Sequence, residues 1–235
     1  MNNAQKDAEK NLVNSASTLE QVQQNLQTAQ QLDNAMGELR HSIANKDQVK
    51  SDSKYLNEDP QIKQNYDNAV QRAEGLINAT QNPELLKANI DQATQSVQNA
   101  EQALHGAEKL NQDKQTSSTE LDGLTDLTDA QREKLREQIN TSNSRDDIKQ
   151  KIEQAKALND AMKKLKEQVA QKDGVHANSD YTNEDSAQKD AYNNALKQAE
   201  DIINNSSNPN LNAQDITNAL NNIKQAQDNL CLLYT

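Results

Sequence analysis

One short motif with phenolic, amide and acidic groups occurs twice in this chain, and its residue types could bind a cation. The stretch YLNED begins at Tyr55 and YTNED begins at Tyr181, 126 positions later, and each is followed by a second tyrosine. Amide and carboxylate oxygens are ligands that Ca²⁺ accepts, but the regular ligand spacing and turn glycine of an EF-hand loop are absent. We therefore interpret Asn57, Glu58 and Asp59 as architectural, with a cation site as the alternative.

The other reactive side chains form no recognisable catalytic set. The three histidines, His41, His105 and His176, occupy different positions in the repeat and lack a ligand partner at helical spacing, which predicts surface positions. Glycine-rich phosphate loops, nucleophile elbows and HExxH motifs do not occur. The single cysteine, Cys231, can form neither an internal disulfide nor a metal cluster. We expect no enzymatic activity, no catalytic residue, no cofactor and no metal.

Composition favours several thin helical bundles over one thick core. Of the 235 residues 33% are hydrophobic and 2% aromatic, with no Trp or Phe, so large side chains are scarce. Five glycines and three prolines argue against a turn-rich fold. A net charge of −11 disfavours nucleic acid and anionic membranes as partners. No apolar run could span a bilayer, and we expect any secretion signal to lie outside this stretch.

The chain is almost two copies of one 126-residue unit. Residues 32–104 match residues 158–230 at 28 of 73 positions without a gap. Residues 1–31 and 127–157 share 5 of 31 identities, yet their apolar positions stay in register. The last five residues, 231–235, do not continue the helical pattern and are predicted to be a non-native tail. The chain is also expected to open inside a repeat.

Apolar spacing predicts eight helices, near residues 2–15, 18–45, 59–80, 83–114, 128–141, 144–171, 185–205 and 209–231. Along 18–45 and along 144–171, successive apolar residues alternate at spacings of four and three, except at one place where a spacing of three occurs twice in a row. This irregularity rotates the buried face of the helix by about 100°. Each of these is predicted to be one continuous helix that serves two successive bundles. The longer connections are expected at 46–58, at 172–184 and in the nine residues from Gln115.

Capping patterns mark where these helices begin. Thr18 and Thr128 each precede a glutamine by three positions, which is a capping-box sequence. Asp59 and Asp185 are predicted N-caps that also complement the helix dipole. The pairs Asn82-Pro83 and Asn208-Pro209 place an N-cap residue before a proline, and they predict two further helix starts.

Tyrosines and methionines at equivalent repeat positions are assigned to packing. Tyr66 and Tyr192 fall on apolar helical stripes and are predicted to fill the core, while Tyr55 and Tyr181 fold the preceding loop onto the bundle. Met36 and Met162 are likewise expected in the core.

The N-terminal helices have a second interpretation. Residues 6–32 could form an amphipathic partner-binding surface, although their apolar positions are also needed for internal packing. We expect residues 2–31 to be two helices of a bundle that lacks its first helix, with a partly exposed apolar face.

Two modules are similar to known families. LTDAQREKLREQINTSNSRDDIKQKIEQAKALNDAM, from Leu127, resembles a GA module, the three-helix type related to albumin-binding domains. YLNEDPQIKQNYDNAVQRAEGLINATQNPELLKANIDQA, from Tyr55, and its second copy resemble a FIVAR module. Their alternation, over nearly all of residues 1–230, resembles the giant cell-wall-associated matrix-binding adhesins of staphylococci.

The resemblance implies an all-α fold, an elongated tandem array of three-helix bundles joined by shared long helices. The modules expected are a partial GA-type module at 1–31, a FIVAR-type bundle at 32–104, a GA-type bundle at 105–157 and a FIVAR-type bundle at 158–230.

The resemblance also implies a secreted, monomeric, non-enzymatic spacer on a bacterial cell wall that binds host matrix proteins such as fibronectin. Albumin binding is the weaker implication, and no ligand-binding residue is assigned. The alternatives are a specific binding module for albumin or a glycan, and an intracellular helical scaffold.

Overall fold

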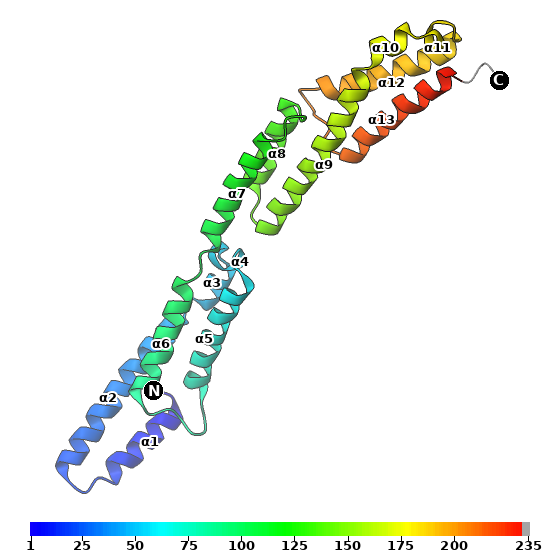
Figure 1. The fold of residues 1–235 in the computed structure, drawn as a ribbon. Helices are drawn as coiled ribbons and strands as arrows, with labels where there is room; N and C mark the ends of the chain where they lie inside the picture. Colours follow the sequence, from blue (N-terminus) through cyan, green and yellow to red (C-terminus); the bar gives the residue numbers. More distant parts are fainter. Residues whose placement is uncertain (232–235) are drawn as a thin grey trace. The chain divides into compact units, whose positions relative to one another are not determined.

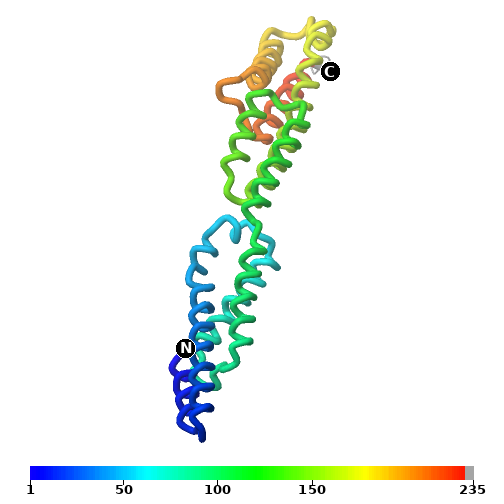
Figure 2. The backbone as a smooth tube through the Cα atoms, turned by 90° about the vertical axis from the view of Figure 1, so that its left-hand side faces the viewer, coloured from blue at the N-terminus to red at the C-terminus, as the bar shows by residue number. Residues whose placement is uncertain are grey.

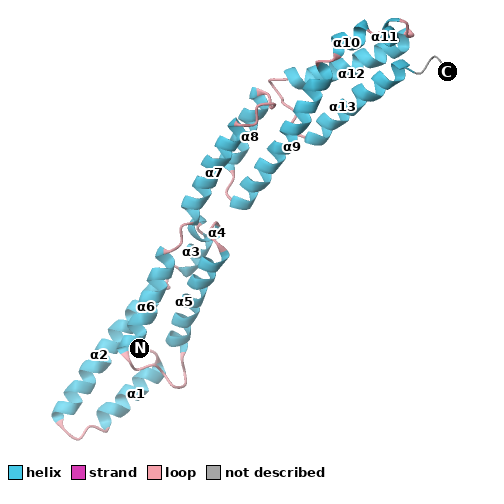
Figure 3. Ribbon diagram, viewed as in Figure 1, coloured by secondary structure: helices cyan, strands magenta, loops and turns pink. Residues whose placement is uncertain are grey.

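The computed structural model describes residues 1–231, and helices account for most of them (Figure 3). Within that range no strand occurs, so the predicted all-α class is confirmed. The chain folds as two compact units, the first comprising Met1–Leu110 and the second beginning at Asn111. Of the predicted tail at 231–235, residues 232–235 lie outside the described part of the chain.

The first unit is organised around one long helix. Its elements are α1 (Asn3–Asn14), α2 (Leu19–Ser42), α3 (Lys46–Ser51), α4 (Ser53–Leu56), α5 (Pro60–Asn78) and α6 (Lys87–Gln102). Helix α2 packs against α1 and then continues along α5 and α6, as Figures 1 and 2 show. The core of the α2–α5–α6 bundle includes Leu32, Met36, Leu39, Tyr66, Val70, Ile90, Val97 and Leu104.

The second unit repeats this plan with an additional helix. Helix α7 (Gly106–Asp122) begins before the unit boundary and is followed by α8 (Asp129–Thr141), α9 (Arg145–Val169), α10 (Lys172–Ala177), α11 (Ser179–Thr182), α12 (Ser186–Asn204), α13 (Ala213–Asp228) and the 3₁₀ turn η1 (Asn229–Cys231). Helix α9 packs against α8 and then against α12 and α13 (Figure 1). Its 25 residues span about 37 Å at 1.5 Å per residue.

The two successive spacings of three explain how one continuous helix packs in two bundles. In α9, Ile148, Ile152 and Ala155 are buried in the first bundle. Leu158, Met162 and Leu165, on a face rotated about the helix, are buried in the second. The prediction of continuous shared helices near 18–45 and 144–171 is therefore confirmed.

The predicted helix at 83–114 is wrong, because the chain breaks between α6 and α7. Helix α6 ends at Gln102, and Leu104 turns into the core with 4% of its surface exposed. The N–H of His105 donates to the carboxylate of Glu58 at 2.5 Å instead of continuing the α6 ladder. The spacing of apolar residues continues unchanged across the break between α6 and α7, so the spacing could not reveal the break.

The predicted helix starts at Pro83 and Pro209 are also wrong. Helices α6 and α13 begin four residues later, at Lys87 and Ala213. Asn82 has φ of 47°, a left-handed conformation that a helix start does not continue. Asp59 and Asp185, in contrast, lie at the predicted N-cap positions.

Three predicted loops contain helices. Of the nine residues from Gln115, the first eight, to Asp122, belong to α7, where the Thr119 hydroxyl donates to the carbonyl oxygen of Gln115 at 3.1 Å. Ser and Thr are tolerated within a helix when they bond back to it in this way. The segments 46–58 and 172–184 each fold into two short helices, α3 with α4 and α10 with α11.

Candidate functional site

The duplicated tyrosine motif fastens the short helices to the bundle in each unit. Tyr66 and Tyr192 are fully buried, as predicted. Their rings meet those of Tyr55 and Tyr181 edge to face, with centroids 6.0 and 6.1 Å apart. Such aromatic pairs stabilise a fold by roughly 0.5–1.5 kcal/mol beyond their burial. Burial raises the pKa of the Tyr66 phenol to about 12, so the group stays neutral.

The two copies complete this contact with different chemistry. In the first unit, the Tyr55 hydroxyl donates to Asp67 at 2.9 Å, and Asp67 pairs with Lys50 at 2.8 Å. In the second unit, Asn193 donates to the Tyr181 hydroxyl at 2.9 Å.

His176 takes the position of Lys50 in the second unit, 3.0 Å from the Asn193 oxygen, with its ring 4.5 Å from that of Tyr181. It is therefore half-buried, which corrects the prediction that it lies at the surface. His41 and His105 are exposed, as predicted.

The acidic residues of the motif accept hydrogen bonds from a lysine side chain and from backbone N–H groups. The Glu58 side chain is fully buried and contacts the amino group of Lys109, which also pairs with Asp59 at 2.6 Å. Burial opposes ionisation of Glu58, but the hydrogen bonds from Lys109 and from the N–H groups of Asp59 and His105 outweigh it. The net effect is a lowered pKa for the Glu58 carboxyl. Glu58 thus anchors the start of α7, and this supports the architectural interpretation over a cation site.

Gly106 makes this anchoring possible. A Cβ placed at Gly106 would lie 2.5 Å from the backbone nitrogen of Glu58 and 2.6 Å from the carbonyl oxygen of Lys54. Only a glycine permits so close an approach between the first turn of α7 and the segment that carries the motif. Among the residues that the structure describes, no group of three or more His, Cys, Asp or Glu side chains could hold a metal ion.

A buried glutamine ties the two bundles of each unit together. Gln5 and Gln131 are both fully buried, and each belongs to a capping box at the start of its helix. The amide of Gln5 donates to the carbonyl oxygen of Glu84 at 2.7 Å, and that of Gln131 donates to Asn210 at 2.8 Å. These carbonyls lie in the loop before α6 and in the loop before α13. Sequence reasoning recognised the capping box at Thr128 but did not predict the contact with Asn210.

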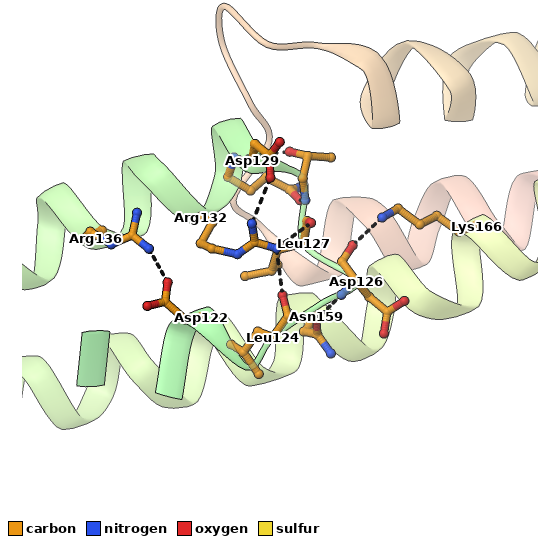
Figure 4. A network of polar contacts seen from close by, with 11 residues as sticks. Asp122, Leu124, Asp126, Leu127, Asp129, Arg132, Arg136, Asn159 and Lys166 are labelled. Carbon is orange, nitrogen blue, oxygen red and sulfur yellow. Dashed lines mark hydrogen bonds and ion pairs between the residues drawn. The ribbon is translucent and has the colours of Figure 1, made fainter. Parts of the chain in front are cut away.

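The loop between α7 and α8 has its own polar network (Figure 4). Arg132 donates to the carbonyl oxygens of Leu124 and Leu127 at 3.3 and 3.4 Å and pairs with Asp129. The loop is held to α9 at Asp126, whose N–H donates to Asn159 at 2.9 Å and whose carbonyl oxygen accepts from Lys166 at 2.7 Å.

None of these sites arranges a nucleophile beside a base, and what they do is hold helices together. The core position predicted for Met36 and Met162 is confirmed, since both are fully buried. No helix among residues 1–231 is long and apolar enough to cross a bilayer.

Comparison with known families and structures matches this architecture. The FIVAR domain model matches residues 35–105 and 161–230, and the GA module model matches residues 1–35 and 107–161. The extracellular matrix-binding protein EbhA of Staphylococcus aureus (strain Newman) is 43% identical over 230 residues, 98% of this chain. The protein ebh of strain NCTC 8325 is 44% identical over the same length. The chain spans between 2 and 7% of the length of these relatives.

Two solved structures are similar. A crystal structure of an EbhA domain from Staphylococcus aureus has a TM-score of 0.72 and 32% identity, covering 83% of this chain and 77% of that one. The other is from a study of adherence to fibronectin mediated by the extracellular matrix binding protein Embp of Staphylococcus epidermidis. It has a TM-score of 0.52 and 35% identity, covering 53% of this chain and 98% of that one.

Proposed function

Because the chain belongs to the family of proteins built from FIVAR domains and GA modules, we propose that it is a segment of a bacterial surface adhesin that acts by binding rather than catalysis. The observation that carries this proposal is the unbroken alternation of the two modules, with 43% identity to a matrix-binding protein over 230 residues. The proposal includes the cell wall as location and the four modules at 1–31, 32–104, 105–157 and 158–230.

Within this function, the chain serves as a spacer as well as an adhesive surface. Two features of each unit support that role, since each resists separation of neighbouring bundles: the shared helix and the buried glutamine. A compact monomer of 235 residues would have a radius of gyration of about 18 Å. Small-angle scattering should give a clearly larger value at monomer mass, and a value near 18 Å would contradict the spacer role.

The proposed ligand is a host matrix protein of the fibronectin type. The support is the similarity, at 35% identity, to a structure from a study of fibronectin adherence. The whole chain should bind immobilised fibronectin saturably, and albumin, presented in the same way, should give no saturable signal. Binding to neither would contradict the adhesive role, whereas binding to albumin alone would favour the GA modules as the contact surface.

A further inference from the structure

In the first unit, one side-chain amide covers the end of α5. The amide nitrogen of Asn2 donates to the carbonyl oxygens of Leu76, Ile77 and Ala79, at 3.4, 3.2 and 3.0 Å. The last carbonyl oxygens of a helix have no partner within the helix, and they form the negative end of its dipole. Asn2 therefore supplies a donor to the end of α5, while its side-chain oxygen accepts from Gln5 and caps α1.

The equivalent helix end in the second unit has no such donor. Thr128 holds the repeat position of Asn2, and it has a hydroxyl in place of the amide. Its oxygen accepts from the N–H of Gln131 at 3.2 Å and so caps α8. Within residues 1–231, no loop or side-chain group donates to the carbonyl oxygens of the three residues that correspond to the partners of Asn2, which are Ile202, Ile203 and Asn205. The end of α12 is therefore left without the donor that α5 has.

A pocket lies at this uncovered helix end. Its volume is about 330 Å³, and it is lined by Asp201, Ile202, Asn205, Asn208, Pro209 and Asn210. Ile202 and Asn205 are two of the residues whose carbonyl oxygens lack a donor. The loop that forms the pocket wall lies beside the start of α8 (Figure 1), where Gln131 fastens it by donating to Asn210. The pocket is thus part of a fixed structure.

The second unit also adds a negative charge to this pocket. Asp201 holds the position of Gly75, and its side chain is exposed. An ionised carboxylate and a carbonyl oxygen can only accept hydrogen bonds, and the C-terminal end of a helix favours positive charge. In the first unit a single nitrogen, that of Asn2, reaches all three carbonyls. Lysine is the side chain that places three N–H donors and a positive charge on one nitrogen.

A second pocket continues from the first along the same loop. It measures about 600 Å³, and its walls are Gln154 and Ala157 of α9 and the loop residues 209–213. Pro209 and Asn210 line both pockets. Ala157 holds the position of Gln31, so a small apolar residue replaces a long polar one. The second pocket therefore fits an apolar side chain beside the lysine, which a protein ligand offers and a free amine does not.

We propose that the end of α12 binds a lysine side chain of a protein ligand, and that the adjoining pocket receives an apolar residue next to that lysine. The ammonium nitrogen donates to the three carbonyl oxygens at this helix end, and its charge pairs with Asp201. A net charge of −11 attracts such a basic partner. The site does not depend on which matrix protein the chain binds, and short peptides test it separately from fibronectin binding.

The first test titrates Nα-acetyl-lysine N-methylamide into the whole chain while amide chemical shifts are recorded by NMR. Amides of residues 202–212 should shift. Those of residues 76–86, the equivalent stretch of the first unit, should not, because Asn2 already covers that helix end. The trimethyllysine analogue keeps the charge but has no N–H donor on its side chain, and it should bind about tenfold more weakly. Equal affinities, or equal shifts in both stretches, would overturn the proposal.

The variant Thr128→Asn transfers the amide of Asn2 to the second unit. It keeps the cap of α8, since an asparagine makes the same capping bond at position 2. Its amide should cover the end of α12, so binding of the lysine probe should be lost. The matched control is Thr128→Ser, which keeps the hydroxyl and adds no amide, and it should bind as the native chain does. Undiminished binding by Thr128→Asn would overturn the assignment.

The variant Asp201→Asn tests the carboxylate. The side chain is exposed, so the change removes no packing. Affinity for the lysine probe should fall about fivefold, because a charge-assisted hydrogen bond becomes a neutral one. An unchanged affinity would overturn the role of Asp201.

Two peptides identify the source of the ammonium group. Acetyl-Leu-Lys-Leu-amide should bind about tenfold more tightly than acetyl-Gly-Lys-Gly-amide, because it buries apolar surface in the second pocket. Ala157→Gln, which introduces the residue type of Gln31 at an exposed position, should remove this difference and leave binding of the glycine peptide unchanged. Equal affinity of the two peptides for the native chain would overturn a protein segment as the occupant, in favour of a free amine.

Discussion

Gln131 donates its side-chain amide to the carbonyl oxygen of Asn210 at 2.8 Å, across 79 residues of sequence, and Gln5 makes the same bond to Glu84. In both units the glutamine oxygen accepts the N–H of the N-cap residue, Thr128 or Asn2. One fully buried side chain therefore begins a helix and fastens it to the loop of the neighbouring bundle.

Replacing Gln131 should separate these two roles. Gln131→Glu keeps the oxygen that accepts from Thr128 but cannot donate to Asn210, so it leaves that carbonyl without its partner. We expect a loss of roughly 1–3 kcal/mol in the free energy of unfolding, measured by urea denaturation. Hydrogen exchange should quicken most in the loop at 205–212, and less in α8, whose capping bond from Thr128 is kept. Faster exchange in α8 alone would mean that the bond to Asn210 does not fasten the loop.

Substitution of Gly106 and of Gly75 by alanine should change the stability of the chain in opposite directions. Gly106→Ala places a Cβ within 2.6 Å of backbone atoms of the motif segment, so we expect destabilisation and fast exchange at residues 103–109. Gly75→Ala lies within α5 with open space around its Cβ, and it should stabilise the chain by roughly 0.5–1 kcal/mol. Denaturation of both variants tests this, and a stable Gly106→Ala variant would contradict the close approach.

Glu9 should make the first unit less stable as the pH rises. It holds the position of Leu135, is 4% exposed, and its Oε2 atom has no hydrogen-bond partner. Burial raises the pKa of the Glu9 carboxyl, so the native state retains a proton that the unfolded state loses at lower pH. The stability present below the usual glutamate pKa of about 4.3 is therefore lost as pH rises through the raised value.

The variant Glu9→Leu tests whether Glu9 makes the first unit less stable as the pH rises. At neutral pH it should slow hydrogen exchange across α1 and raise stability by roughly 1–3 kcal/mol, and the pH dependence of that exchange should flatten. The reciprocal variant Leu135→Glu should give α8 the pH dependence that α1 loses. If native α1 becomes more protected as pH rises from about 4 to 7, after correction for intrinsic exchange, the assignment is wrong.

The register of α9 is tested by insertion. One residue added between Lys156 and Ala157 rotates everything after it by about 100° and removes Leu158, Met162 and Leu165 from their core. We expect loss of cooperative unfolding in the second unit. The matched control is one residue added between Ser206 and Ser207, which are exposed, and it should change the midpoint by little. Equal effects would contradict the shared-helix arrangement.

Most helices could be predicted because their signals are local. The spacing of Leu158, Met162 and Leu165 reports a buried face wherever the partner helix lies. The starts at Pro83 and Pro209 failed because the deciding contacts are distant: the carbonyls of Glu84 and Asn210 accept from glutamines 79 residues earlier. A local capping pattern contains no information about them.

The contacts at the candidate site were harder to predict than the helices. The pairing of Glu58 with Lys109 joins residues 51 positions apart in a chain with 25 basic and 36 acidic side chains, so no pair stands out. Gln5 did leave a signal. It is one of only five identities between residues 1–31 and 127–157, although a surface glutamine would have been free to vary.

Tyr55 and Tyr181 have different hydrogen-bond partners, and this difference affects how the chain avoids misfolding. Adjacent similar repeats can exchange elements while they fold. If α3 and α10 exchanged places, Lys50 would meet Asn193 instead of Asp67, and His176 would lie beside Asp67 without its amide partner. The variant Lys50→His with Asp67→Asn makes the two sites alike and should refold with a lower yield of monomer, measured by gel filtration after dilution from urea. Divergence between the copies thus gives each bundle a means of recognising its own segments.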